Sequence, residues 1–158
     1  MSKQQPDKLS PRWVEYFRGK MLASANMSKD ANTKVGAVIF CEKNKVELSS
    51  GWNDLPRGVE HTPERNSRPL KYKLTVHAEA NAVANAARIG VPTSGASIIV
   101  SMFPCSICAG LLVNAGILRV YSPPPDMNHI SCGEDYKYSL EIFEEAWVEI
   151  VYLESSGL

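Results

Sequence analysis

One continuous stretch of the chain, residues 96–121, reads ASIIVSMFPCSICAGLLVNAGILRVY and contains a strand, a helix and a second strand. The apolar run 96–102 predicts the first strand, and residues 117–121 predict the second. Between them, residues 105–115 predict a helix that ends at Gly116. Because two strands joined by a helix pair in parallel within one sheet, this stretch predicts an α/β fold.

Outside this stretch, the rest of the chain continues the alternation of helices and strands. Further helices are expected over residues 10–26, 76–89 and 136–146, and further strands over 35–41, 46–50 and 148–153. Residues 51–75 are rich in Gly and Pro and show little periodicity, so they predict a long loop. The whole order predicts a three-layer α/β/α sandwich around a five-stranded mixed sheet.

Composition narrows the kinds of protein that this chain can be. Its 158 residues predict one domain over positions 1–158, in which the polar residues 1–9 are expected to be flexible. Seventeen Lys and Arg balance seventeen Asp and Glu, which argues against binding to nucleic acid or to an anionic membrane. We expect neither a membrane span nor a signal peptide. Four cysteines are too few for a disulfide framework, so we expect a cytoplasmic protein.

Three residues have the types and the spacing of metal ligands. His77 opens a predicted helix, and Cys105 and Cys108 lie three residues apart at the start of another. One imidazole and two thiolates suit Zn²⁺, and three protein ligands leave a fourth position for water, as in catalytic zinc sites. The helix N-terminus also favours the thiolate form that binds metal. The alternative is a structural zinc ion closed by a fourth ligand such as Cys132 or His129.

Glu79 follows His77 by two residues and is the candidate catalytic residue. Zinc lowers the pKa of bound water from ~16 to about 7, and a carboxylate that is not itself a ligand can then carry the proton. We expect hydroxide to attack an amidine carbon while Glu79 carries protons to the ring nitrogen and to the leaving amine. These residue types therefore indicate a hydrolytic reaction in which zinc activates water.

The same residues resemble a known family. Residues 77–79 (HAE), followed by 104–108 (PCSIC), resemble the H-x-E…P-C-x-x-C signature of the cytidine deaminase superfamily. Further segments resemble its deoxycytidylate (dCMP) deaminases: residues 29–37 (KDANTKVGA), 51–58 (GWNDLPRG) and 115–117 (AGI). The resemblance implies a cytidine deaminase-like fold, zinc as cofactor and a homo-oligomer. It also implies hydrolytic deamination of a free pyrimidine nucleotide, with dCMP converted to dUMP and ammonia as the leading reaction.

Three residues are candidates for substrate binding. By their motif positions, the resemblance implies that Asn53 contacts the sugar and that the backbone of Ala78 contacts the base. Asn53 could instead hold a turn, as Asn often does. Phe103 lies beside the two cysteines in the sequence and could be either a wall on which the base stacks or a core residue.

The sequence departs from the resembling family where the family binds a 5′-phosphate. Met27 stands in place of a basic residue, and residues 122–125 (SPPP) stand in place of an aromatic and a basic residue. The long loop offers other cations: Arg57, Arg65, Arg68, Lys71 and Lys73. A nucleoside or nucleobase deaminase, acting on cytidine, cytosine or guanine, therefore stays open as an alternative. So does a zinc-containing protein that binds nucleotides without catalysis.

Overall fold

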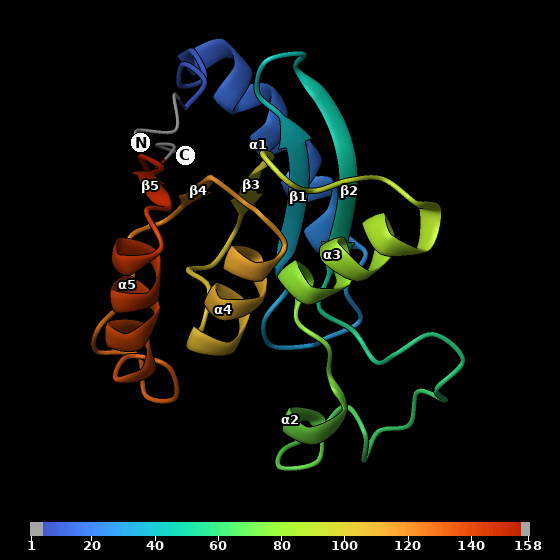
Figure 1. The fold of residues 1–158 in the computed structure, drawn as a ribbon. Coiled ribbons are helices and arrows are strands. Elements are labelled where there is room, and N and C mark those ends of the chain that lie inside the picture. The colour runs from blue at the N-terminus through green and yellow to red at the C-terminus, as the bar shows by residue number, and fades with distance from the viewer. Residues whose placement is uncertain (1–4, 156–158) are drawn as a thin grey trace.

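A computed structural model of the chain describes residues 5–155 and contains helices and strands in alternation (Figure 1). The helices are α1 (Pro11–Asn26), α2 (Lys71–Leu74), α3 (Ala78–Ile89), α4 (Ser106–Asn114) and α5 (Asp135–Glu145). The strands are β1 (Gly36–Cys41), β2 (Val46–Trp52), β3 (Ser97–Val100), β4 (Arg119–Ser122) and β5 (Glu149–Tyr152). Apart from α2, the order of these elements along the chain matches the order predicted from the sequence.

The strands form one five-stranded mixed sheet in the order β2-β1-β3-β4-β5. β1 pairs antiparallel with both β2 and β3. β3, β4 and β5 run parallel, because α4 and α5 each carry the chain back between consecutive strands. The predicted five-stranded mixed sheet is therefore confirmed.

Helices cover both faces of this sheet, as Figure 1 shows, with α1 behind it and α3, α4 and α5 in front. On the α1 face, Phe17 stacks on Phe40 with ring centroids 4.1 Å apart. Alternate residues of β1 face the other way, and Ile39 belongs to a second cluster with Ala82 of α3 and Leu112 of α4. This alternation is the period of a strand buried on both faces. The three-layer α/β/α arrangement is confirmed.

Close packing of α3 on β2 fixes the position of the site described below. Gly51 permits this contact, because a Cβ atom there would lie 2.4 Å from the backbone nitrogen of Ala82. Two side-chain hydrogen bonds hold the helix in place. Ser49 Oγ donates to the Ala82 carbonyl at 2.6 Å, and Asn81 Nδ2 donates to the Trp52 carbonyl at 2.7 Å. The N-terminus of α3 is thus held rigidly against the sheet.

The structure differs from the sequence expectations in several places. β2 extends to Trp52, two residues beyond the expected end. The predicted long loop contains the one-turn helix α2. Residues 5–9, expected to be flexible, lie against the sheet, where Leu9 is buried and its N–H donates to Tyr121 Oη at 3.0 Å. The rest of that expected flexible segment, residues 1–4, lies outside the described residues.

No helix within residues 5–155 has the length and apolar character needed to cross a membrane.

Candidate active site

His77 lies at the point where the chain enters α3. Its backbone is extended (φ −68°, ψ 155°), so it forms the N-cap instead of the first helical turn expected from residue 76 onward. Just before it, Val76 forms an isolated antiparallel bridge with Asp54. This bridge fixes the chain direction, so that the His77 ring and the first turn of α3 can serve one site.

The two cysteines occupy the corresponding position on α4. Cys105 is the N-cap of this helix, with an extended backbone, and Cys108 lies in the first turn. A carboxylate from α5 holds this turn, because Asp135 accepts a hydrogen bond from the Ser106 N–H at 2.7 Å and another from Ser106 Oγ at 2.6 Å. The Asp135 carboxylate thereby satisfies a backbone donor that has no acceptor within the helix.

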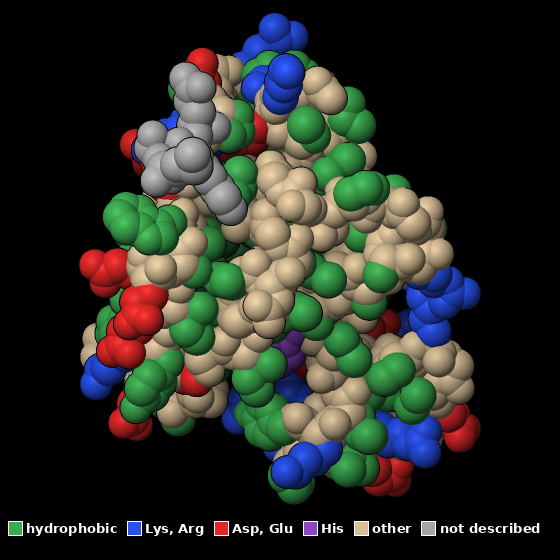
Figure 2. All heavy atoms as spheres, in the orientation of Figure 1, with side chains coloured by type: hydrophobic (Ala, Val, Ile, Leu, Met, Phe, Trp, Pro, Cys, Tyr) green, Lys and Arg blue, Asp and Glu red, His purple; other side chains and the backbone are tan. Residues whose placement is uncertain are grey.

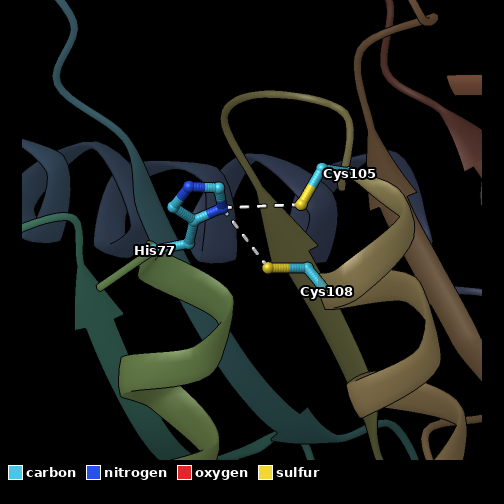
Figure 3. Close-up of side chains that lie close together, drawn as sticks. All are labelled: His77, Cys105 and Cys108. Carbon is cyan, nitrogen blue, oxygen red and sulfur yellow. Dashed lines mark hydrogen bonds between the residues drawn. The ribbon is translucent and has the colours of Figure 1, made fainter. Parts of the chain in front are cut away.

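The three candidate ligands converge on one point, as Figure 3 shows. His77 Nδ1 lies 3.5 Å from Cys105 Sγ and 3.5 Å from Cys108 Sγ. All three donor atoms lie within 4.8 Å of one another, and within residues 5–155 no other such group of metal-ligating side chains occurs. Neither Cys132 nor His129 belongs to it. One nitrogen and two sulfur donors at this spacing fit a zinc ion.

The two thiols of this cluster differ in acidity. A hydrogen bond with Cys108, supported by His77, lowers the pKa of Cys105 to about 4. The same hydrogen bond and burial raise the pKa of Cys108 far above its usual range. The hydrogen bond with Cys105 also raises the pKa of His77. The lowered pKa of Cys105 favours the thiolate, which is the form that binds metal.

Glu79 lies in the first turn of α3 and is only 4% exposed. Burial raises the pKa of its carboxyl. Its oxygens are not part of the cluster formed by His77, Cys105 and Cys108. The geometry thus places a buried carboxyl beside the three donor atoms without making it a fourth ligand.

The donor cluster opens into a pocket, which also contains all three predicted substrate-binding residues: Asn53, Ala78 and Phe103. Figure 2 shows a hollow on this face, with a histidine and Lys or Arg side chains visible inside it. Ala78 is buried and presents the first backbone N–H of α3, which has no acceptor within the helix.

Asn53 holds two backbone segments together and also lines the pocket. Its Oδ1 accepts the Val35 N–H at 2.8 Å, and its Nδ2 donates to the Thr33 carbonyl at 2.8 Å. It therefore holds the segment before β1 against the end of β2. One N–H and one lone pair remain on the amide, and the side chain lines the pocket.

Phe103 likewise belongs to both the core and the pocket wall. It is 4% exposed, and its ring packs edge-to-face on Tyr136, with centroids 5.3 Å apart. Both rings line the pocket. The alternatives of core residue and pocket wall do not exclude each other here.

A sequence comparison decides the family of this chain. The family described as "Cytidine and deoxycytidylate deaminase zinc-binding region" matches residues 11–122. The chain belongs to this family. The match spans α1 to β4 and includes His77, Glu79, Cys105 and Cys108, so the family resemblance noted in the sequence is confirmed.

Individual deaminases show how far the similarity reaches. An uncharacterized deaminase encoded in the luxG 3′ region of Aliivibrio fischeri is 36% identical over 143 residues, covering 90% of this chain and 94% of that protein. Human deoxycytidylate deaminase is 37% identical over 114 residues. This match covers 68% of this chain but only 62% of the human protein.

A solved deaminase structure has the same fold. The dCMP deaminase of cyanophage S-TIM5, in complex with dCMP and dUMP, superposes with a TM-score of 0.74 at 21% identity. The superposition covers 92% of this chain and all of that chain.

Several residues that line or support the pocket of this deaminase family member were not identified from the sequence. Asp135 supports the α4 turn from 29 positions away, and no local pattern joins it to Ser106. Tyr136 has the spacing of an ordinary core residue of α5. Asp30 pairs with Lys71 inside the pocket, although 41 positions separate them in the sequence. Only the fold brings these residues together.

Proposed function

We propose that this chain is a zinc-dependent hydrolytic deaminase of a free pyrimidine nucleotide, with dCMP as its leading substrate. The observation that carries the proposal is the convergence of one nitrogen and two sulfur donors beside a buried glutamate that is not part of their cluster. A site that only binds zinc for structural purposes has no need of that carboxyl.

His77, Cys105 and Cys108 are the residues that would hold the zinc ion, from the N-termini of α3 and α4. Their donor atoms are already gathered in the protein, so little reorganisation is needed for binding. When bound, zinc supplies Lewis acidity, which makes a water molecule acidic enough to act as a nucleophile near neutral pH.

Glu79 is proposed to move the protons. In the net reaction, a bond from C4 of cytosine to the water oxygen forms, and the bond from C4 to the amino nitrogen breaks. Glu79 takes the two protons of the water molecule in turn, delivering the first to the ring nitrogen N3 and the second to the departing amino group, which leaves as ammonia. Burial raises the pKa of this carboxyl above its usual value, which favours its acting as a proton donor as well as an acceptor.

The other pocket residues are proposed to orient the nucleotide. The free N–H and lone pair of Asn53 suit a sugar hydroxyl, and the backbone at Ala78 suits the polar edge of the base. The face of Phe103 is proposed to stack on the base, because its edge-to-face contact with Tyr136 holds the ring in place. The deoxycytidylate deaminases among the relatives support dCMP as the leading substrate.

The test is ammonia release by zinc-loaded protein from dCMP, deoxycytidine, cytidine, cytosine and guanine, measured in parallel. We expect the highest kcat/KM with dCMP. A higher kcat/KM with a nucleoside or a base would identify that class of compound, and not the nucleotide, as the substrate. Tight binding of dCMP without ammonia release from any of these compounds would overturn the enzymatic proposal.

The organisation of the protein is part of the same proposal. We propose that residues 1–158 form one deaminase domain, that it assembles as a homo-oligomer, and that it works in the cytoplasm. The cysteines at positions 41, 105, 108 and 132 are all unpaired, which suits a reducing compartment. Light scattering on the protein as it elutes from a size-exclusion column should give a mass of at least two chains. The mass of one chain would contradict self-association.

A further inference from the structure

The pocket that contains Glu79 is lined by one arginine, Arg68, and one lysine, Lys71. A nucleotide carries a phosphate with up to two negative charges, which needs a cationic partner where it leaves bulk water. Met27 and residues 122–125 do not line this pocket. The question is therefore which cation of the chain is free to bind the phosphate.

Lys71 is already committed to an acidic partner. Its Nζ lies 3.0 and 3.2 Å from the two carboxylate oxygens of Asp30. Both side chains are largely buried, at 9% and 12% exposure. Asp30 also accepts the backbone N–H groups of Asn32 and Thr33, so the carboxylate is held in place. This ion pair is electrically neutral as a whole and offers no spare charge to a phosphate.

The remaining cations of the long loop lie outside this pocket. Arg57 donates to Asn85 Oδ1 at 2.8 Å and lines a separate, smaller depression. Arg65 donates to the Glu60 carbonyl at 2.9 Å. Lys73 lines neither cavity. Arg68 is thus the one loop cation that both lines the pocket and lacks an acidic partner within residues 5–155.

The position of Arg68 suits a phosphate. Its guanidinium lies over the ring of Tyr72, with 5.6 Å between Cζ and the ring centroid, and both side chains line the pocket. Stacking of this kind occupies the face of the guanidinium and leaves the N–H groups at its edge available. Arg68 is exposed at the rim, whereas Glu79 is buried. A phosphate bound there would keep part of its hydration while the base reaches the interior.

We propose that Arg68, stacked on Tyr72, binds the 5′-phosphate of the substrate and so determines the preference for a nucleotide over a nucleoside. The inference rests on the proposed function. A guanidinium presents two parallel N–H groups, which match two phosphate oxygens, and such charge-assisted hydrogen bonds are among the stronger ones in proteins. The preference then comes from a loop residue and not from the helices that carry the metal ligands.

The experiment compares kcat/KM for dCMP and for deoxycytidine in the wild type, Arg68→Gln, Arg68→Lys and the matched control Arg65→Gln. In Arg68→Gln, we expect the ratio of the two values to fall by about 10- to 100-fold, mainly through a higher KM for dCMP. Arg68→Lys should recover part of the ratio, because it restores the charge without the planar fork. Arg65→Gln should leave the ratio unchanged.

An unchanged ratio in Arg68→Gln, or an equal loss with both substrates, would overturn the inference. Affinities for dUMP and deoxyuridine, measured by calorimetry on the same zinc-loaded proteins, make the test independent of turnover. If the wild type deaminates neither compound, the proposed function fails. The inference about Arg68 is then decided by whether Arg68→Gln weakens dUMP binding while that of deoxyuridine stays the same.

Discussion

Two buried glutamates lie at opposite ends of the sheet, and their surroundings differ. Glu42 follows β1 near the start of β4, because Phe40 pairs with Ser97 and Ser97 pairs with Arg119. Glu79 lies in α3 at the other end, where the chain leaves β3 for α4. Both carboxyl groups are almost completely inaccessible, at 2% and 4% exposure of their residues.

Both carboxylate oxygens of Glu42 accept hydrogen bonds from neighbouring side chains. One of its oxygens accepts from Arg119 Nη1, and the other accepts from Tyr121 Oη at 2.6 Å. Burial and this hydrogen bond raise the pKa of Tyr121 to about 12. Arg119 also donates to Glu149 at 2.8 Å and to the Pro6 carbonyl at 2.9 Å, so the cluster holds the N-terminal segment on the sheet.

Glu79, in contrast, forms no ion pair with a lysine or arginine within residues 5–155. A buried carboxyl that is hydrogen-bonded to a guanidinium stays ionised and holds structure together. A buried carboxyl without such a partner can exchange a proton at moderate cost. The difference predicts that changes at Glu79 affect the reaction, whereas changes around Glu42 affect folding.

The largest expected effect is on the reaction rate. Glu79→Gln removes the proton carrier and keeps the size of the side chain, so we expect kcat for dCMP to fall by about 10²- to 10⁴-fold. Thermal stability should not fall, because no ion pair is broken. The matched control Glu141→Gln, on the exposed face of α5, should keep the wild-type rate. Full activity of Glu79→Gln would remove the distinction between the two glutamates.

The next effect is on folding. Arg119→Met leaves Glu42 buried without its cation, and we expect a loss of about 3–5 kcal/mol in the free energy of unfolding. Urea titration measures this loss, with the exposed Arg12→Met as control. Adding Glu42→Gln to the variant should recover part of the stability, because it removes the unpaired charge. A stability change below about 1 kcal/mol would mean that this cluster is not structural.

A smaller effect, on zinc affinity, is expected from changing a residue that supports the metal ligands. Asp135→Asn keeps the shape but weakens the hydrogen bonds to Ser106 that fix the α4 turn. We expect the affinity for zinc to fall by about 10- to 100-fold, the usual loss when a group behind a ligand is changed. Competition with a chelator measures it. The neighbouring Glu134→Gln should bind zinc as the wild type does, and equal affinities in all three proteins would refute the supporting role of Asp135.

The smallest effect is a pH dependence of stability from Glu149. Burial disfavours the charged form, but hydrogen bonds from Lys8 and Arg119 outweigh it and lower the pKa of Glu149 below its ordinary value of 4.5. Its contribution is therefore present above pH 4.5 and is lost as the pH falls through the lower folded pKa. Glu149→Gln should remove about 1 kcal/mol or less at pH 7 and flatten the acid limb of the stability curve. The same acid limb in Glu149→Gln and in the control Glu145→Gln would contradict this.

Much of the fold could be predicted from the sequence, because local patterns encode it. The apolar run that becomes β3 and the Gly116 that ends the α4 segment are both readable without a structure. Ends of elements were predicted less well. Val76 was expected to be helical, but its bridge to Asp54 keeps the chain extended up to His77. Such a bridge depends on a residue 22 positions away and leaves no local signal.

The residues of the candidate site also fall into two groups: some could be predicted from local sequence patterns, and others depend on contacts between distant segments. His77, Glu79, Cys105 and Cys108 could be found because their residue types and spacing carry the chemistry. Lys71 and Arg68 could not be told apart from the other basic residues of the loop. Only the structure shows that Lys71 is paired with Asp30, whereas Arg68 lines the pocket and has no acidic partner among residues 5–155. Roles that depend on pairing between distant segments can be identified only from the three-dimensional structure.

The central claim is that three side chains hold one zinc ion and leave Glu79 as a free carboxyl. Zinc content per chain, measured by mass spectrometry on the purified wild type, Glu79→Gln and Cys108→Ala, tests it most directly. We predict one zinc ion per chain in the wild type and in Glu79→Gln, and loss of zinc in Cys108→Ala. Loss of zinc from Glu79→Gln, or full zinc content in Cys108→Ala, would contradict the account.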